Sequence, residues 1–177
     1  MRILVALIGR TMPGFHPLLD LIGKEFGATV TTEFLDMPIT RSFRSQRGQY
    51  DAEVFLKELA PMVSHHADMT AFITREDLFA GGLNFVFGLA SGRNCIVSLA
   101  RLDPRFYGPV SSPAKANAIF KERIQKETLH ELGHTSGLGH CDDKNCVMSF
   151  SNSLEEVDAK GRAFCERCKK EIKTKSG

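Results

Sequence analysis

The sequence contains no apolar segment that approaches the roughly 18 residues needed to cross a membrane, so we expect no membrane-spanning segment. Net charge is also small, because 23 Lys and Arg residues against 21 Asp and Glu residues leave only +2, too little to indicate a nucleic-acid partner. We also expect no signal peptide, since the apolar segment 3–8 is too short and no small-residue cleavage site follows it. We therefore expect a cytoplasmic protein, in which the five cysteines serve as thiols or metal ligands rather than as disulfides.

The length of 177 residues, with 42% hydrophobic and 25% charged residues, predicts one globular domain that can bury its own core. Segment 38–48 is polar and rich in arginine, and we expect a surface loop there. Pro61 is expected to kink or end the helix in which it lies. Hydrophobic periodicity predicts strands at 2–9, 28–36 and 68–75 and helices at 17–26 and 51–64. This alternation predicts an α/β fold with a twisted, mixed and mostly parallel sheet.

The middle of the chain predicts a hairpin and then a long helix. Segments 83–90 and 94–101 have the composition of strands, and the short connection Ser91-Gly92-Arg93 allows them to pair antiparallel. Further along, Ser112-Pro113 is typical of a helix start, and Gly137 of a helix end. We therefore expect one continuous helix between these two signals.

The most informative segment runs from His130 to His140 and reads His-Glu-x-x-His-x-x-Gly-x-x-His. His130 and His134 are four residues apart on the predicted helix, so their side chains project from one face, one turn apart. Gly137 allows a sharp turn that brings His140 back toward them. Three imidazoles at this spacing can hold one Zn²⁺ and leave one coordination position open for water.

Glu131 stands beside these ligands, about 100° around the helix from His130, and can reach a bound water. The arrangement predicts zinc-dependent hydrolysis of a peptide bond, in which Glu131 takes a proton from the attacking water and returns one to the leaving amine. The alternatives are a structural zinc and histidines that make only ordinary hydrogen bonds. Structural zinc sites usually have four protein ligands and no open position, which favours the catalytic interpretation.

Four cysteines follow the last histidine in a Cys-x₄-Cys pair and a Cys-x-x-Cys pair: Cys141, Cys146, Cys165 and Cys168. This spacing matches a four-thiolate zinc site, and the alternative is two disulfides. Cys95 stands alone in an apolar segment and is expected to be a buried core thiol.

Together with Met148, this histidine and cysteine pattern resembles the archaemetzincin family of metzincin zinc peptidases, over residues 130–168. The resemblance implies that Met148 forms an apolar floor beneath the catalytic zinc, and that the four cysteines bind a second, structural zinc. It also implies a compact metzincin-like fold in a single metalloprotease domain, 1–177. That domain would have an upper subdomain of about residues 1–136 and a small, zinc-stabilised lower one of about 137–177.

The same resemblance implies an antiparallel edge strand above the metal, with which an extended substrate pairs as an additional strand. The predicted strand at 84–90 is the candidate, because it precedes the active-site helix by one further strand. The residues expected to bind substrate are Asn84, Phe85, Val86, Phe87 and Gly88.

The sequence thus predicts a monomeric zinc peptidase with two Zn²⁺ per chain that acts on a peptide or protein substrate, with neither nucleic acid nor membrane as a partner. One rival is a zinc-binding interaction module with little or no peptidase turnover, and the presence of Glu131 argues against it. Another is a zinc-stabilised nucleic-acid or protein adaptor that uses the cysteine module and the basic C-terminal tail. An aminopeptidase needs an acidic group that holds the free amine, and the sequence alone does not identify one.

Overall fold

The computed structural model describes residues 1–9, 15–63 and 66–175, and the fold is built around a five-stranded sheet. The strands in spatial order are β2 (Thr29–Leu35), β1 (Arg2–Ile8), β5 (Met69–Thr74), β8 (Asn94–Ser98) and β7 (Gly88–Ser91). The first four run parallel, and β7 pairs antiparallel with β8 at the edge. The predicted α/β fold with a mostly parallel sheet and an antiparallel edge strand is confirmed.

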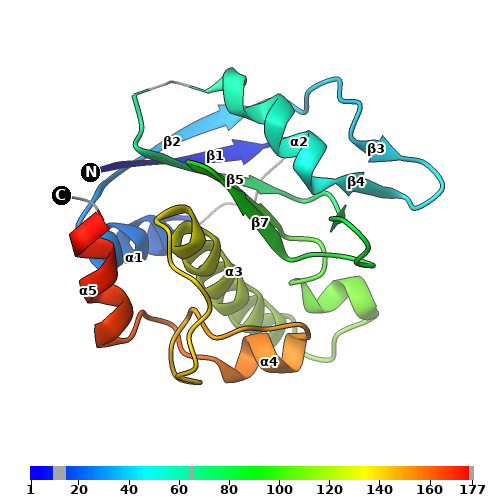
Figure 1. Cartoon of the computed structure of the whole chain (residues 1–177). Coiled ribbons are helices and arrows are strands. Elements are labelled where there is room, and N and C mark those ends of the chain that lie inside the picture. Colours follow the sequence, from blue (N-terminus) through cyan, green and yellow to red (C-terminus); the bar gives the residue numbers. More distant parts are fainter. Residues whose placement is uncertain (10–14, 64–65, 176–177) are drawn as a thin grey trace.

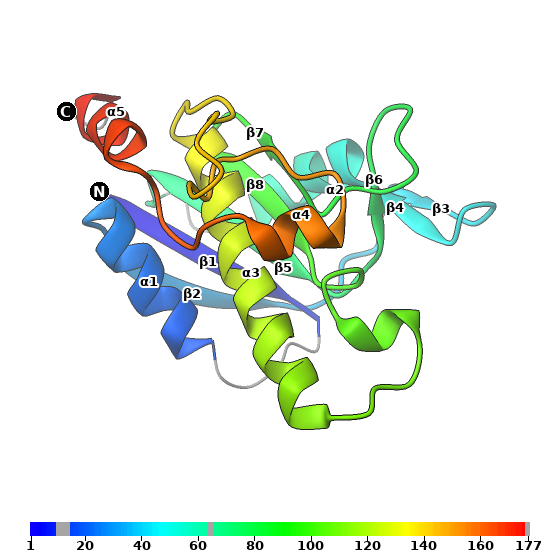
Figure 2. The ribbon, with the colours of Figure 1, turned by 90° about the horizontal axis from the view of Figure 1, so that it is seen from below.

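Helices cover both faces of this sheet (Figure 1). One face carries α2 (Ala52–Leu59), and the other carries α1 (His16–Phe26) and the long α3 (Pro113–Thr135). β1 is buried on both sides because alternate side chains point to opposite faces: Ile3 joins the core beside α1 and α3, and Leu4 the core beside α2. Seen from below, α3 crosses the sheet with α1 alongside it (Figure 2).

After α3 the chain forms an irregular segment and two short helices, α4 (Leu154–Ala159) and α5 (Glu166–Lys175), which pack against α3 and α1 respectively. A small second sheet, in the order β3 (Phe43–Arg44), β4 (Gln49–Asp51) and β6 (Leu78–Phe79), lies beside the main one. Within the described parts of the chain, no helix combines the length and apolar character that a bilayer crossing requires.

Several predicted boundaries need correction. The helix expected at 51–64 ends at Leu59 and continues as a 3₁₀ turn, Ala60–Met62, because Pro61 cannot supply the next helical hydrogen bond; Ser64 lies outside the described residues. Segment 38–48 is only partly a loop, since it contains β3. The strand predicted at 94–101 is shorter than expected, because β8 ends at Ser98.

The strand predicted at 83–90 is wrong over 83–87, because backbone groups of Leu83, Asn84 and Val86 find partners other than β8. Arg47 donates to the carbonyl oxygens of Leu83 and Asn84, each at 3.1 Å, and the Gln49 side chain donates to Asn84 O at 3.0 Å. The N–H of Val86 donates to Leu78 O in β6. These contacts come from distant parts of the chain, so the periodicity of the segment alone could not reveal them.

Candidate metal centres and cleft

Local sequence signals determine where α3 begins and ends, and thereby where its histidines lie. Ser112 caps the N terminus by accepting a hydrogen bond from the N–H of Lys115 at 3.4 Å, and Pro113 occupies the first turn. At the other end Gly137 has φ +87°, in the left-handed region that favours glycine. The chain leaves the helix axis at this glycine, which allows His140 to return to the helix.

Three histidine side chains converge at the end of α3: the candidate ligand atoms of His130, His134 and His140 all lie within 4.8 Å of one another. Nδ1 of His130 lies 2.9 Å from Val147 O, and Nδ1 of His134 lies 2.9 Å from Leu138 O. Because a carbonyl oxygen only accepts, both Nδ1 atoms carry the ring proton and both Nε2 atoms present lone pairs. These Nε2 atoms are 3.0 Å apart, and a cation bound by both would stabilise such facing lone pairs. The donor set therefore fits Zn²⁺.

Burial and nearby charge favour the neutral form of His130 and His140, which is the form that binds a metal. Burial, together with the nearby ammonium group of Lys160, lowers the pKa of His130 to about 2. The pKa of His140 is also lowered, first by burial and then by His134 and Lys160. Protons therefore compete weakly for the ring nitrogen atoms of these two histidines.

Glu131 lies between α3 and the edge of the sheet, where only 6% of the residue is exposed. Burial raises the pKa of its carboxyl to about 8, with Glu127 adding to the rise and Lys160 opposing it. Glu131 lines the same cleft as the three histidines, close to the end of α3 at which a metal would bind.

Met148 is fully buried and packs against the α3 turn that lies between His130 and His134. A Cβ atom added to Gly133 would collide with Met148 Sδ and would lie 3.1 Å from its Cε. The backbone of Met148 also accepts a hydrogen bond from the N–H of Cys141 at 2.9 Å. Met148 thus links the helix that bears the histidines to the segment that bears the cysteines.

The four cysteines named from their spacing also come together, with ligand atoms within 4.8 Å of one another. Cys141 Sγ lies 3.8 Å from Cys165 Sγ, and Cys146 Sγ lies 3.8 Å from Cys168 Sγ. These separations exceed the roughly 2.05 Å of a disulfide and equal the edge of about 3.8 Å expected for a tetrahedron with Zn–S bonds of about 2.3 Å. Each of the four is a free thiol, so disulfide pairing is wrong and the cluster fits a metal. Cys95 is fully buried, as expected for a core thiol.

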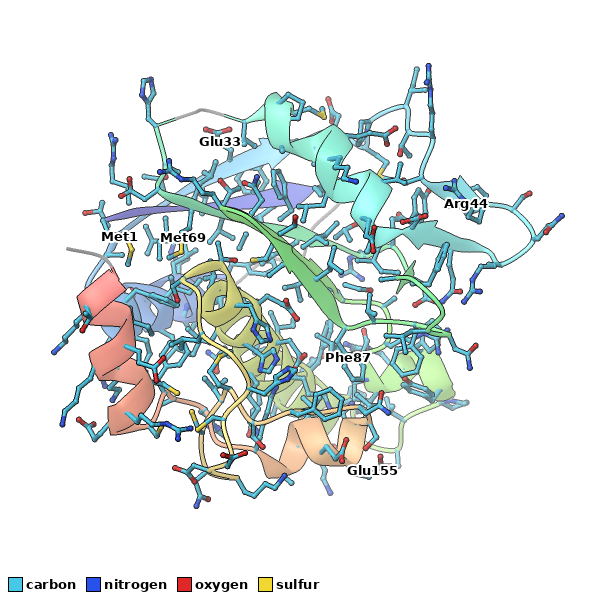
Figure 3. The ribbon with its side chains drawn as sticks, viewed as in Figure 1. Met1, Glu33, Arg44, Met69, Phe87 and Glu155 are labelled. Atoms are coloured by element: carbon cyan, nitrogen blue, oxygen red, sulfur yellow. The ribbon has the colours of Figure 1, made fainter. Side chains whose placement is uncertain are left out.

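The cleft beside the histidines has a volume of about 400 Å³. Its upper wall includes four of the five predicted substrate-binding residues, Phe85, Val86, Phe87 and Gly88. Asn84 does not line it; its carbonyl oxygen is held by Arg47 and Gln49. Figure 3 shows Phe87 between β7 and α4. The lower wall is formed by Phe150, Ser151 and Asn152, which follow Met148.

Sequence reasoning missed a buried ion pair behind the histidines. Lys160 Nζ lies 2.7 Å from Glu127 Oε1 and 3.4 Å from His130 Nδ1, and the side chains of Lys160 and Glu127 are 2% and 4% exposed. Glu127 also lines the cleft. Its position four residues before Glu131 on α3 was a readable signal, whereas nothing near Lys160 in the sequence indicates that this lysine is buried.

Comparisons with known proteins agree with this geometry. The profile of "Peptidase family M54" matches residues 36–174. Archaemetzincin of Methanocaldococcus jannaschii is 42% identical over 152 residues, covering 85% of this chain and 80% of the relative, and archaemetzincin of Methanopyrus kandleri is 49% identical over 132 residues, covering 72% and 67%. The crystal structure of the Methanopyrus kandleri archaemetzincin superposes with a TM-score of 0.83 at 36% identity, over 99% of this chain and 95% of that one. The chain belongs to peptidase family M54 and is a zinc metallopeptidase of the archaemetzincin family.

Proposed function

We propose that the three histidines hold the catalytic zinc and that Glu131 is the general base for peptide hydrolysis at that ion. The observation that carries the proposal is the pair of Nε2 atoms 3.0 Å apart, each belonging to a ring whose Nδ1 atom faces a carbonyl oxygen. Zinc bound there would supply Lewis acidity, which acidifies a coordinated water and polarises the scissile carbonyl. Glu131 accepts the proton of the attacking water on its carboxylate and then delivers a proton to the leaving amine.

The cysteine cluster is proposed to hold a second zinc with a structural role, giving two ions per chain. Arg167 Nη2 donates to Cys141 Sγ at 3.1 Å, and the N–H of Cys165 donates to Cys146 Sγ at 3.3 Å. Donors directed at sulfur stabilise thiolates, the form that binds zinc. A zinc there would tie residues 141–146 to 165–168 and so stabilise the lower subdomain, about 137–177, below the cleft. A monomeric state and a cytoplasmic location remain predictions.

Substrate is proposed to add to the free edge of β7, at Gly88 and Ala90. The N–H of Ser98 donates to Phe87 O at 2.8 Å, and β7 pairs with β8 in the same register. Because hydrogen-bonded and non-hydrogen-bonded pairs alternate along an antiparallel ladder, residues 88 and 90 direct their N–H and C=O groups away from β8. An extended peptide bound to these groups would pass the histidines with its backbone paired. The proposed backbone contacts with substrate therefore move from residues 84–87 to β7 itself. Phe85 and Phe87 line the wall of the cleft.

Replacing Glu131 with alanine tests the proposed chemistry. Glu131→Ala should keep both zinc ions and lose hydrolysis by about 100-fold or more, because general acid–base catalysis supplies about 10²–10⁴-fold. The matched control is Glu155→Ala, which removes an exposed glutamate from α4 and should hydrolyse peptide like the parent.

Two outcomes would contradict the proposal in different ways. Hydrolysis by Glu131→Ala at the parental rate would mean that Glu131 is not the base. A zinc-loaded parent that cleaves no member of a broad peptide library would instead support the interaction module without turnover.

A further inference from the structure

β7 passes over α3 at the turn that carries Glu131, and the contact is made by a glycine. A Cβ atom built on Gly88 would lie 2.5 Å from Glu131 Cγ, 2.8 Å from its Cδ and 2.8 Å from its Oε1. Real Cβ atoms do not approach other atoms this closely, so an alanine at this position would require the glutamate to move. The Glu131 side chain therefore occupies the space that any other residue at position 88 would fill.

Backbone conformation does not explain this glycine. Gly88 is absent from the glycines with positive φ and lies in a regular strand, paired with Val97. An L-residue could adopt the same backbone without strain. Space for the carboxyl of Glu131 is therefore the reason for glycine at position 88.

Two neighbouring residues on the same face of the hairpin, Ala90 and Cys95, are small as well. Gly88 stands opposite Val97 and Ala90 opposite Cys95, and Val97, Cys95 and Ala90 all belong to the core beside α3. Leu89 and Ile96, which alternate with them, belong to the core on the other side of the sheet. Small side chains on the α3 side allow the helix to approach β7 closely. Close approach places Glu131 directly beside the strand whose free edge would bind the substrate backbone.

We propose that Gly88 is a positioning residue for the Glu131 carboxylate. The missing side chain at position 88 lets the carboxylate lie between α3 and β7, in the cleft that the histidines also line, and the packed strand keeps it there. A methyl group at this position would displace the carboxylate from the water that it must deprotonate. The inference rests on the proposed role of Glu131 as the base.

Four proteins test it: the parent, Gly88→Ala, Glu131→Ala and the double variant. Gly88→Ala should retain two zinc ions and an unchanged KM while kcat falls about 100-fold, the scale expected for a catalytic group misplaced by about 1 Å. Gly82→Ala is the matched control, because Gly82 has no atom within 4 Å of an added Cβ and no positive φ, and its kcat should equal that of the parent.

Thermal unfolding of the same proteins keeps the inference testable if Gly88→Ala folds poorly. Glu131→Ala removes the three atoms nearest to the new methyl group, so Gly88→Ala should lower the unfolding midpoint in the parent and leave it nearly unchanged in the Glu131→Ala background. This coupling would distinguish positioning of Glu131 from a general packing role.

Each contrary result overturns a defined part of the reasoning. If Glu131→Ala is inactive but Gly88→Ala keeps the parental kcat, the role of Gly88 is wrong and the proposed function stands. If Gly88→Ala lowers the midpoint equally in both backgrounds, Gly88 serves packing and does not act through Glu131. If Glu131→Ala remains fully active, both the role of the base and that of Gly88 are wrong.

Discussion

Replacing Lys160 with methionine should destabilise the protein strongly, because it leaves Glu127 buried without its counter-ion. The two side chains are 2% and 4% exposed, and their charged atoms are 2.7 Å apart. Removing one partner of such a pair costs about 3–5 kcal/mol, mainly through the charge that remains unpaired. For a chain of this length, about 2–4 °C per kcal/mol gives a midpoint roughly 6–20 °C lower.

Two further variants separate the ion pair from other effects of the substitution. Arg44→Ala breaks the exposed pair with Asp51, whose atoms are 3.3 Å apart and whose side chains are 42% and 22% exposed, and should cost less than about 1 kcal/mol. Adding Glu127→Leu to Lys160→Met removes the unpaired charge and should restore most of the lost stability.

Urea unfolding at a fixed excess of zinc is the suitable assay, since bound metal contributes to the apparent stability. Zinc content should be measured on the same samples, because Lys160 Nζ also lies 3.4 Å from His130 Nδ1. A loss below about 1 kcal/mol for Lys160→Met would refute the reasoning. The reasoning would also be refuted if the double variant Lys160→Met/Glu127→Leu were as unstable as Lys160→Met alone.

Three other outcomes follow from the structure. Gly133→Ala should destabilise the protein by about 1–3 kcal/mol in urea unfolding, because the added methyl group meets Met148 and lies 3.1 Å from a ring carbon of Phe164. Helix propensity alone predicts a gain in stability, and such a gain would contradict this packing. Cys165→Ser should lose one zinc per chain by elemental analysis and lower the unfolding midpoint, whereas unchanged zinc content would exclude the proposed structural site. In zinc-free protein the pKa of His130 is depressed from 6.5, so the contribution of its neutral ring to the free energy of unfolding is fully present above pH 6.5 and is lost as pH falls below that value, by up to about 1.4 kcal/mol per pH unit. His130→Gln should flatten this pH dependence in urea unfolding at several pH values, and an equal slope in the two proteins would contradict it.

Features encoded within a few neighbouring residues were predictable from the sequence. Ser112 and Pro113 mark the start of α3, Gly137 marks its end, and the spacing of the histidines along one helix follows from its period. The hairpin of β7 and β8 follows from its two-residue turn at Gly92-Arg93. In each case the decisive interactions are local, so the residue types and their spacing contain the information.

Features that depend on partners far apart in the chain were not predictable. Segment 83–87 looks like a strand, but Arg47 and Gln49, more than thirty positions earlier, bind the carbonyl oxygens of Leu83 and Asn84. Lys160 looks like a surface lysine, and only the packing of the chain after α4 onto α3 buries it against Glu127. The requirement for glycine at position 88 likewise appears only when β7 lies against Glu131.

Zinc content, measured by elemental analysis together with peptide hydrolysis, tests most directly whether the three histidines hold the catalytic ion. The parent is predicted to contain two zinc ions per chain, and His134→Ala one, held by the cysteines, with hydrolysis abolished. A parent that contains a single zinc, lost when Cys165 is replaced, would leave the histidine site unfilled and would contradict the account.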